Sequence, residues 1–222
     1  MPPVKRDQPE GAAEPLRRRR MRTARTHLRI KKAAYEAFCE RGYAGTTMAH
    51  VAERAGVAVQ TVYFVFHTKA ELLSHSYDYA VGGEPEPIVP EAQPFYREMV
   101  AATDVVVGLR HFAAGAGEIT RRVAPLYVVS RGAALGDPEV ARVHSFHEDW
   151  RADGYREVLA ILRKKASLRP NVSPERAVQL LLMYVGPDVY DALVRTHGWT
   201  HDEWLDWAVD TLAEQLFGQP PA

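Results

Sequence analysis

The chain has 222 residues, 46% of them hydrophobic, which suffices for a small domain and one larger core. Its formal net charge is zero, yet residues 1–75 carry 14 Lys and Arg against 7 Asp and Glu, whereas residues 76–222 carry 14 against 21. The longest apolar run, Leu180 to Val185, is shorter than the roughly 18 residues of a membrane span. No apolar stretch follows the basic N-terminus, so the pattern of a secretory signal peptide is missing. The single cysteine allows no internal disulfide. We therefore expect a cytoplasmic protein that does not enter a membrane.

Residues 15–35 are strongly basic. No acidic residue occurs between Pro15 and Tyr35, while nine Lys and Arg side chains crowd into the same stretch. A basic end is the electrostatic signature of a surface that neutralises phosphates, although a solvated polybasic tail has the same composition. We predict a disordered basic arm over residues 1–25, in which Arg22 and Arg25 contact DNA.

Residues 46–72 show the pattern of a helix-turn-helix. Apolar side chains recur at helical spacing on both sides of a single glycine, Gly56: first Val51, Ala52 and Ala55, then Val57, Val62 and Val65. A tight turn between two helices needs a residue that tolerates a positive φ, and glycine does so without steric cost. Such a unit places its second helix in the major groove of DNA. An ordinary helical hairpin buried in a core is the alternative for this stretch alone.

The same region carries a dense set of motif residues without a gap: Ala33, Ala34, Phe38, Glu40, Arg41, Gly42, Tyr43, Thr46, Thr47, Val51, Ala52, Ala55, Gly56, Val57, Thr61, Tyr63, Phe66, Lys69 and Leu72. This set resembles the DNA-binding domain of the tetracycline-repressor (TetR) family of transcriptional regulators. A looser resemblance to the ligand-domain ending of such regulators lies between Asp188 and Leu216. The resemblance implies an all-α fold, with an N-terminal three-helix helix-turn-helix domain and a larger C-terminal helical domain for ligand binding and dimerisation.

The implied function is that of a ligand-responsive repressor. It would bind a near-palindromic double-stranded DNA operator as a homodimer, and a small molecule would release it by moving the helix at residues 69–79. Half-sites one helical turn or a multiple apart tolerate little error in the distance between the two recognition helices. No nucleophile elbow, phosphate-cradling glycine loop or strong metal-binding motif is present, so we expect no enzymatic activity, no cofactor and no metal.

The second helix of the motif should supply the base contacts, from its exposed start and outer face: Val59, Gln60, Thr61 and Phe64. Gln60 is the sole amide among them and can pair with adenine, or else touch only phosphate or water. The resemblance assigns the phosphate backbone to Thr47, Tyr63 and Lys69, with Thr46 as a further DNA contact beside them. The chain departs from the family pattern at four positions, where Ser, Lys, Gly and His or Tyr are common: Ala58, Val59, Gln60 and Val65.

The rest of the chain reads as helices separated by caps and breakers. Thr68 with Glu71 favours a helix from Lys69 to Tyr79, and four prolines between residues 82 and 94 preclude a regular element there. The domains expected are 26–80 for DNA binding, 81–94 as a linker and 95–222 for ligand binding and dimerisation. Within the C-terminal domain we expect helices at about 95–114, 118–135, 138–166, 174–185 and 201–217. Gly186-Pro187 should break the helix at 174–185, after which a short helical segment resumes up to about residue 196.

Two surfaces of the C-terminal domain have expected partners. Residues 180–185 are apolar on every side of a helix and the final helix is nearly so, which favours dimerisation through these C-terminal helices. A pocket for an apolar or aromatic effector is expected between the connecting helix and the helices at 95–166, because large aromatic groups with a few polar ones line small-molecule sites. Its expected lining is Phe112, Tyr127, Arg131, His147, Trp150 and Tyr184.

Two other classes of function stay open at this point. His144 and His147 are three residues apart on a helix and share a face, so an all-helical metal-dependent enzyme is the first alternative. The spacing is weak support, because neither an HExxH motif nor paired cysteines accompany it. A structural helical protein with a basic tail is the second alternative, and predicts that its main activity survives removal of residues 1–75.

Overall fold

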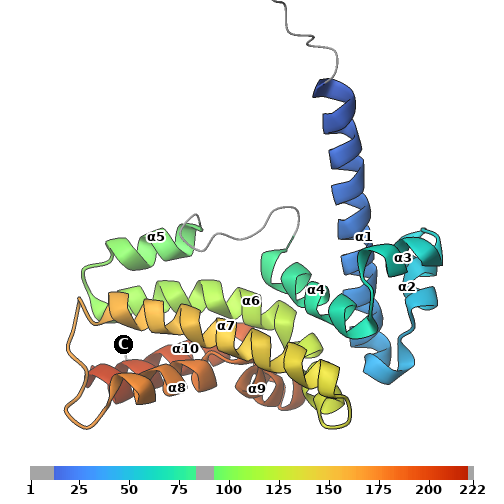
Figure 1. The fold of residues 1–222 in the computed structure, drawn as a ribbon. Coiled ribbons are helices and arrows are strands. Elements are labelled where there is room, and N and C mark those ends of the chain that lie inside the picture. Colours follow the sequence, from blue (N-terminus) through green and yellow to red (C-terminus); the bar gives the residue numbers. More distant parts are fainter. Residues whose placement is uncertain (1–12, 84–92, 220–222) are drawn as a thin grey trace, which may run out of the picture.

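The computed structural model describes residues 13–83 and 93–219, and within these ranges it contains helices and no β-strand. The predicted all-α class is confirmed. Figure 1 shows a small N-terminal domain on one side, a larger helical body on the other, and the single helix α4 between them. This arrangement agrees with the two-domain architecture that the sequence predicts.

The N-terminal domain consists of α1 (Ala13–Gly45), α2 (Met48–Ala55) and α3 (Val59–Val65). Gly42 interrupts the helical course of α1 with φ 69° and ψ 177°, a conformation that strongly favours glycine. Thr47 caps α2 by accepting a hydrogen bond from the backbone N–H of His50, and Gly56 ends α2 in the left-handed region with φ 63°. The predicted turn at Gly56 is therefore confirmed.

Helix α4 (Lys69–Gly82) connects the N-terminal domain to the body. The Thr68 hydroxyl accepts from the backbone N–H of Glu71 at 3.0 Å, and the Glu71 carboxylate accepts from the backbone N–H of His67 at 3.0 Å. The predicted cap is present, with the carboxylate bonded one residue further out than in a capping box. The helix continues to Gly82, beyond the boundary predicted at residue 80, and most of the predicted linker lies outside the described residues.

The body begins with α5 (Pro94–Ala101), α6 (Val105–Ala134) and α7 (Pro138–Leu162). The predicted break between residues 114 and 118 is wrong, because the chain breaks at 102–104 and Asp104 caps α6 by accepting two backbone N–H groups. Gly115 and Gly117 instead allow close packing inside α6. A Cβ on Gly115 would lie 2.1 Å from the ring of Phe95, and one on Gly117 would lie 2.8 Å from the side chain of Leu205. Helix α7 also ends four residues before the predicted residue 166.

The remaining elements are α8 (Pro174–Tyr184), α9 (Pro187–Tyr190), the π-helical turn η3 (Asp191–Thr196), α10 (His201–Leu212) and the π-helical turn η4 (Ala213–Phe217). The predicted capping box at the start of α10 is present, with Thr200 and Glu203 bonding reciprocally. Gly218 closes the last turn with φ 69°. The predicted break at Gly186-Pro187 is confirmed as the boundary between α8 and α9.

One stretch, Pro174–Thr196, is long and apolar enough by length and composition to cross a membrane. The length of the longest apolar run did not indicate this. The stretch is broken at Gly186, and Leu181, Val185 and Tyr190 from it are buried in the core of the body. Core helices of soluble proteins pass the same test of composition, so the finding is weak evidence for a membrane span.

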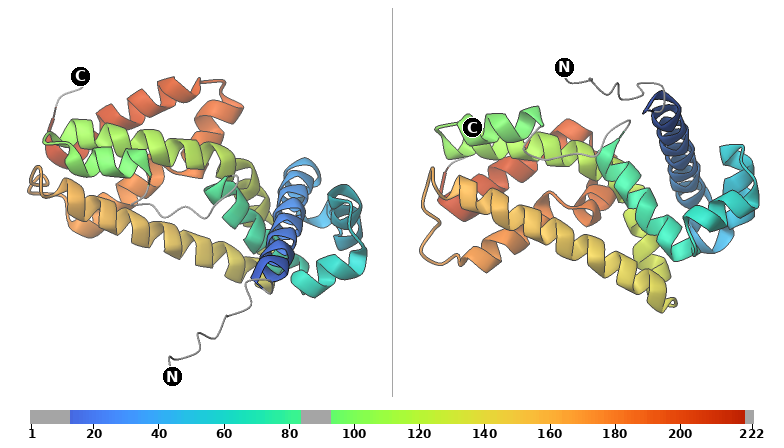
Figure 2. Two further views of the ribbon diagram at one scale, coloured as in Figure 1. Left: turned by 90° about the horizontal axis from the view of Figure 1, so that it is seen from above. Right: turned by 45° about the horizontal axis from the view of Figure 1, so that its top comes forward.

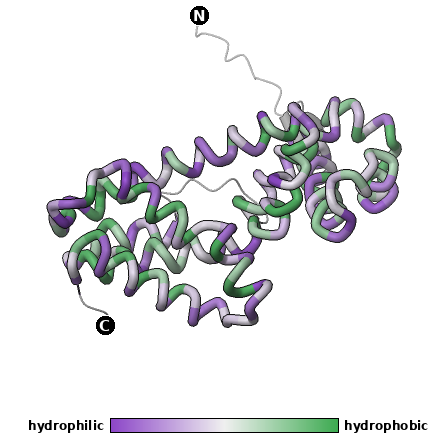
Figure 3. Tube along the Cα trace, turned by 90° about the horizontal axis from the view of Figure 1, so that it is seen from below, coloured by the Kyte–Doolittle hydropathy of each residue, from purple (hydrophilic) through white to green (hydrophobic). Residues whose placement is uncertain are grey.

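Two buried clusters hold the molecule together. One fills the body around Leu109, Leu162 and Trp204, all without exposed surface. The other fills the N-terminal domain around Phe38 and extends to Leu126 of α6 and to α7. Figure 2 shows α6 and α7 running along each other in the body with the N-terminal domain at one end, and Figure 3 shows hydrophobic and hydrophilic positions alternating along these helices. The second cluster joins the two parts, so packing on α6 and α7 sets the orientation of the N-terminal domain.

Candidate nucleic-acid interface

Helix α3 presents large side chains to solvent. Val62 is its single buried residue, whereas Phe64 is 83% exposed and Tyr63 is 53% exposed. Gln60 is exposed as well, and Val59 and Thr61 are partly exposed. An apolar ring left in water this fully has no role in the protein's own core. The residues predicted to read bases therefore lie on an accessible face, as a surface that meets a partner requires.

The two threonines before α2 have different environments. Thr47 is exposed, and its Oγ1 caps α2 at 3.1 Å from the backbone N of His50, which leaves the hydroxyl proton free to donate outward. Thr46 has no exposed surface, and its hydroxyl donates to the backbone oxygens of Gly42 and Ala37 at 2.9 and 3.0 Å. The prediction of Thr46 as a DNA contact is wrong, because its side chain ties the end of α1 to the start of α2.

Lys69 has an internal partner. Its ammonium donates to the backbone oxygen of Tyr43 at 2.9 Å and lies 4.1 Å from the centre of the Tyr43 ring. Burial, followed by the nearby carboxylate of Asp137, raises the pKa of Tyr43 to about 12. An ammonium has three donors, so this bond leaves Lys69 donors for a phosphate. The lysine thus holds the turn after Gly42 and still lies at the border of the candidate interface.

One ion-pair set that the sequence pattern did not indicate fixes α2 on α1. The guanidinium of Arg54 donates to Glu36 at 3.0 Å and to both carboxylate oxygens of Glu40 at 2.6 and 2.7 Å. The bond to Arg54 holds the pKa of Glu40 below its usual value. Two-point contacts of arginine with a carboxylate carry geometric specificity. These contacts join α2 to α1 and therefore help to set the angle between the two helices. Because α3 follows α2, they also help to set the orientation of α3.

The predicted arm differs from expectation. Helix α1 begins at Ala13, so the part of the predicted disordered segment from residue 13 to 25 is helical, and residues 1–12 lie outside the described residues. Arginine has a high helix propensity, and a long arginine-rich run without Gly or Pro can continue the helix that the buried part of α1 starts. Arg22 and Arg25 are exposed on this helix. Arg29, one turn further on, donates to the backbone oxygen of Gly56 at 3.5 Å.

The six residues predicted to line a ligand pocket do not line one cavity. Phe112 is buried against Tyr155 in the core of the body, and Tyr184 packs on Trp207. Tyr127 donates to Asp188 at 3.0 Å, and Arg131 pairs with the same carboxylate. In this structure these side chains satisfy one another or fill the core, so their role in ligand binding stays a prediction. His147 and Trp150 alone among the six border a shared hollow.

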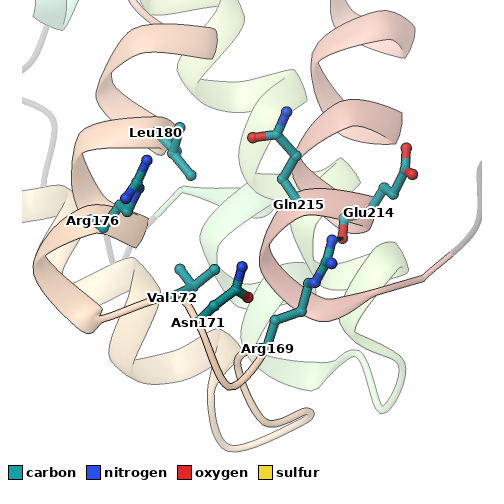
Figure 4. A pocket seen from close by; sticks show the side chains of 7 residues that line it. All are labelled: Arg169, Asn171, Val172, Arg176, Leu180, Glu214 and Gln215. Atoms are coloured by element: carbon teal, nitrogen blue, oxygen red, sulfur yellow. Dashed lines mark hydrogen bonds between the residues drawn. The ribbon is translucent and has the colours of Figure 1, made fainter.

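That hollow is a groove of about 590 Å³ between α1, α4 and α7. Its walls include the half-buried Leu28 and Tyr79 and the exposed rings of Phe146 and Trp150, 62% and 52% accessible. A second hollow of about 680 Å³ lies between the end of α1 and the end of α6. A third of about 420 Å³ lies between the loop after α7 and η4, where Arg169, Arg176 and Glu214 face it (Figure 4). The first groove is the one of the three that contacts α1, α4 and α7 at once.

A chain of buried and partly buried polar contacts, here called the polar seam (Ser74, Tyr77, Ser130, His144 and His147), links α4 to α6 and α7. The Tyr77 hydroxyl lies 2.5 Å from Ser130 Oγ, which is 3.0 Å from His144 Nδ1, and Ser74 Oγ is 3.1 Å from His147 Nε2. The rings of Tyr77 and His147 stack with centres 4.3 Å apart. Burial lowers the pKa of His147 to about 4 and also lowers that of His144. The connecting helix is therefore fastened to the body by this seam.

The metal-enzyme alternative gains no support from this seam. Each of the two histidines is engaged by a serine hydroxyl. Among the described residues, no group of three or more His, Cys, Asp or Glu side chains is arranged to hold a metal ion. The pair instead fastens helices to one another.

A capped helix-turn-helix that exposes its second helix, joined by one helix to a larger helical body, defines the helix-turn-helix class of proteins. Residues 30–75 match the sequence model described as bacterial regulatory proteins of the tetR family. Over these residues the chain is similar to the DNA-binding part of that family.

Individual proteins are similar to parts of the chain or to its fold. The HTH-type transcriptional regulator TtgR of Pseudomonas putida is 43% identical over 58 residues, 26% of this chain and 28% of the relative, so that the chain matches little more than a quarter of TtgR. A structure of a TetR-family transcriptional regulator from Rhodococcus sp. is similar with a TM-score of 0.67 at 14% identity, covering 84% of this chain and 96% of that one. FadR from Bacillus subtilis, solved in complex with stearoyl-CoA, has a TM-score of 0.65 at 15% identity, covering 85% and 98%. At these identities the structures establish the fold.

Proposed function

We propose that the protein is a DNA-binding transcriptional regulator, a ligand-responsive repressor rather than an enzyme, that acts in the cytoplasm. The observation that carries this proposal is α3, a short helix with Phe64 83% exposed and Gln60 beside it, held by a capped and buried scaffold. Val59, Gln60, Thr61 and Phe64 contact base edges in the major groove. Thr47, Tyr63 and Lys69 contact phosphates, which position α3 without reading sequence.

The protein binds a near-palindromic operator as a homodimer formed through α8 and α10. On α8, Leu181 is buried in the body's own core, while Met183 is 47% exposed and Leu180 is half-buried on other faces. On α10, Leu205 and Trp207 are half-buried in the same way. An apolar helix surface that its own domain leaves uncovered favours a second subunit. Sedimentation that shows a monomer at micromolar concentration contradicts the dimer.

The effector binds in the groove between α1, α4 and α7 and is an apolar or aromatic molecule. The volume of about 590 Å³ and the aromatic walls suit a small ligand. FadR from Bacillus subtilis, a structure of the same fold, was solved with stearoyl-CoA, a molecule with a long apolar chain. A ligand that contacts both α1 and α7 binds with an affinity that depends on the orientation of the N-terminal domain relative to the body. It releases DNA if it binds the non-reading orientation more tightly, and a tenfold loss of operator affinity needs about 1.4 kcal/mol of such preference.

The DNA-binding part is tested by selecting bound sequences from a random double-stranded library and measuring retardation of the best one. We expect a two-fold symmetric consensus, and binding that survives EDTA, whereas a metal-dependent enzyme predicts no such consensus. Removal of residues 1–75 is expected to abolish retardation. Unchanged binding after that removal contradicts α3 as the reading element.

The effector part is tested by a compound screen for thermal stabilisation, followed by operator competition with each hit. Trp150→Ala and Phe146→Ala are expected to abolish stabilisation by the hits. Leu135→Ala is the matched control, because Leu135 is 91% exposed and does not line the groove. Hits that stabilise the protein without changing DNA affinity contradict the switch, and hits that bind equally to Trp150→Ala contradict the groove.

A further inference from the structure

Helix α1 is longer than its packing requires. Its buried residues begin at Ile30 and continue through Phe38, whereas Arg17, Arg18 and residues 21–25 are exposed. Figure 1 shows this N-terminal half of α1 projecting past α2 and α3 and away from the body. This part of the helix gains no stability from burial in the protein's own core. A contact of its exposed surface with a partner would give it a role.

The exposed half carries a row of arginines along one face. Arg18, Arg22, Arg25 and Arg29 follow one another at intervals of four, three and four residues, which puts them on a single stripe of a helix. A different face, with Ala24, Leu28 and Lys31, lines the groove toward α4 and α7. No acidic residue interrupts the helix between Pro15 and Tyr35. The stripe is therefore a continuous positive surface directed away from the body.

The direction of the stripe is fixed at its inner end. Arg29 reaches the backbone oxygen of Gly56, the residue of the turn that leads into α3. The row thus starts beside the reading helix and continues outward along α1. With a rise of 1.5 Å per residue, the eleven steps along the helix from Arg18 to Arg29 span about 16 Å, comparable to roughly five base pairs of duplex.

We propose that this row, the arginine ridge (Arg18, Arg22, Arg25 and Arg29), lies along the phosphate backbone of the DNA that flanks each operator half-site. The ridge lengthens the footprint beyond the bases that α3 reads and adds affinity without sequence preference. Because it is helical, its charges are pre-arranged, whereas a disordered arm must become ordered on binding. This inference rests on the proposed function of α3 and extends it to the flanks.

A membrane surface fits the ridge less well than DNA does. A helix that lies on a lipid surface needs a broad apolar face beside its basic one. Here the apolar residue Leu28, next to the stripe, faces the groove against α4 and α7 and is half-buried. Phosphates of a duplex require no apolar face, and arginine suits them by its planar fork of donors.

The test uses a ridge variant, Arg18→Gln with Arg22→Gln and Arg25→Gln, in the full chain. Arg29 is left in place because it contacts the turn before α3. Glutamine keeps a high helix propensity, so circular dichroism should show unchanged helicity. The matched control removes the same number of charges from α7 and its end, with Arg142→Gln, Arg156→Gln and Arg163→Gln, all of them exposed.

Affinity is measured on the selected operator alone and on the same operator lengthened by about one helical turn on each side. The unmodified protein and the control should bind the longer duplex more tightly. The ridge variant should lose this gain, and its slope of log affinity against log salt on the longer duplex should fall by about 0.9 per lost phosphate contact. The control should keep both the gain and the slope.

The outcomes separate this inference from the proposed function. If all three proteins bind the operator but none gains from the flanks, the ridge is overturned while reading by α3 stands. If no protein prefers any sequence, the proposed function fails and the ridge fails with it. If the ridge variant loses binding to vesicles of anionic phospholipid while its DNA affinity and salt slope are unchanged, the ridge docks on lipid and the proposal is overturned.

Discussion

The N-terminal domain and the body are both helical, but different interactions hold them together. In the N-terminal domain, α2 and α3 have 8 and 7 residues, too few to be stable by themselves. Thr47 and Gly56 cap α2, and Thr68 caps α4, the helix that follows α3. In the body, α6 and α7 have 30 and 25 residues, and Gly115 and Gly117 of α6 admit side chains of α5 and α10. Local signals dominate the first region and long-range packing dominates the second.

Because of this difference, we expect the N-terminal domain to determine binding and the body to determine most of the stability. The N-terminal domain keeps its large side chains Tyr63 and Phe64 outside, so changes there should alter binding more than stability. The body keeps Trp204 and its neighbours inside, so changes there should alter stability first. The polar seam joins the two regions and should respond to conditions that affect buried polar groups. Four predictions test this division.

The largest effect is expected for Trp204→Ala in the body. Trp204 is without exposed surface, and its ring and that of Tyr190 are nearly perpendicular, at 86°, with centres 4.8 Å apart. Truncating a buried tryptophan typically costs about 3–5 kcal/mol of unfolding free energy, because the cavity cannot fully close. Urea unfolding followed by circular dichroism, at one protein concentration, measures the loss.

Trp150→Ala is the control for this prediction, since Trp150 is 52% exposed and loses little buried surface. The control should be within about 1 kcal/mol of the unmodified protein. Equal losses for Trp150 and Trp204 contradict the division between a stability region and a binding surface.

The polar seam predicts a loss of stability in acid. Burial lowers the pKa of His147 to about 4 from the 6.5 of a free histidine, with Asp78 opposing the shift and His144 and His75 adding to it. The unfolded chain binds a proton below about pH 6.5 while the folded protein does not until about pH 4, so stability present above pH 6.5 is lost as the pH falls through this window. The loss should be on the order of 2 kcal/mol.

His147→Gln should flatten this part of the pH dependence in urea unfolding between pH 7 and pH 4.5. Gln retains a group that can bond to Ser74, which keeps the comparison fair. His67→Gln is the control because the His67 side chain is 75% exposed. A curve for His147→Gln that is as steep as that of the unmodified protein contradicts a neutral, partly buried His147.

The sequence predicted the caps and turns because each depends on neighbouring residues. Asp137-Pro138, Ser173-Pro174 and Thr200 all begin helices as expected, and Gly56 makes the turn. It did not predict the course of α6, because Gly115 and Gly117 have the same local signature whether they break a helix or admit a side chain. Which one occurs depends on Phe95 and Leu205, far away in sequence.

In the candidate site, too, features that depend on neighbouring residues were predictable, whereas contacts between residues far apart in the sequence were not. The exposed face of α3 follows from helical spacing, and Gln60 and Phe64 are where the pattern predicts. The burial of Thr46 depends on the break of α1 at Gly42, which spacing alone does not reveal. Whether the six predicted ligand-lining side chains meet depends on how separate helices pack, which spacing in the sequence does not reveal. The four arginines are spaced by four, three and four residues, which places them on one face of a helix. The sequence reading did not identify this face because it assumed that residues 1–25 are disordered.

A moderate effect on binding is expected for Gln60→Ala. The change should cost about 1–3 kcal/mol of binding free energy on the best operator and relax the preference at one position per half-site, because a glutamine can pair with two atoms of one adenine. Asn171→Ala, which removes an exposed amide outside α3 and outside the helices of the proposed dimer, is the matched control and should change neither. Unchanged affinity and preference for Gln60→Ala would mean that the amide contacts only phosphate or water.

The smallest effect is expected for Lys69→Ala, and it decides between two roles of one side chain. If the ammonium neutralises a phosphate, the slope of log affinity against log salt should fall by about one for each such contact, equally for all sequences. If it only holds the turn through the Tyr43 carbonyl at 2.9 Å, affinity falls while the slope stays constant. Lys69→Arg keeps the charge and should restore the slope even where the longer side chain disturbs the packing on Tyr43. We expect the slope to fall and to be restored, because two of the three donors on Lys69 remain after its bond to Tyr43, at the border of the surface where Tyr63 and Thr47 are exposed.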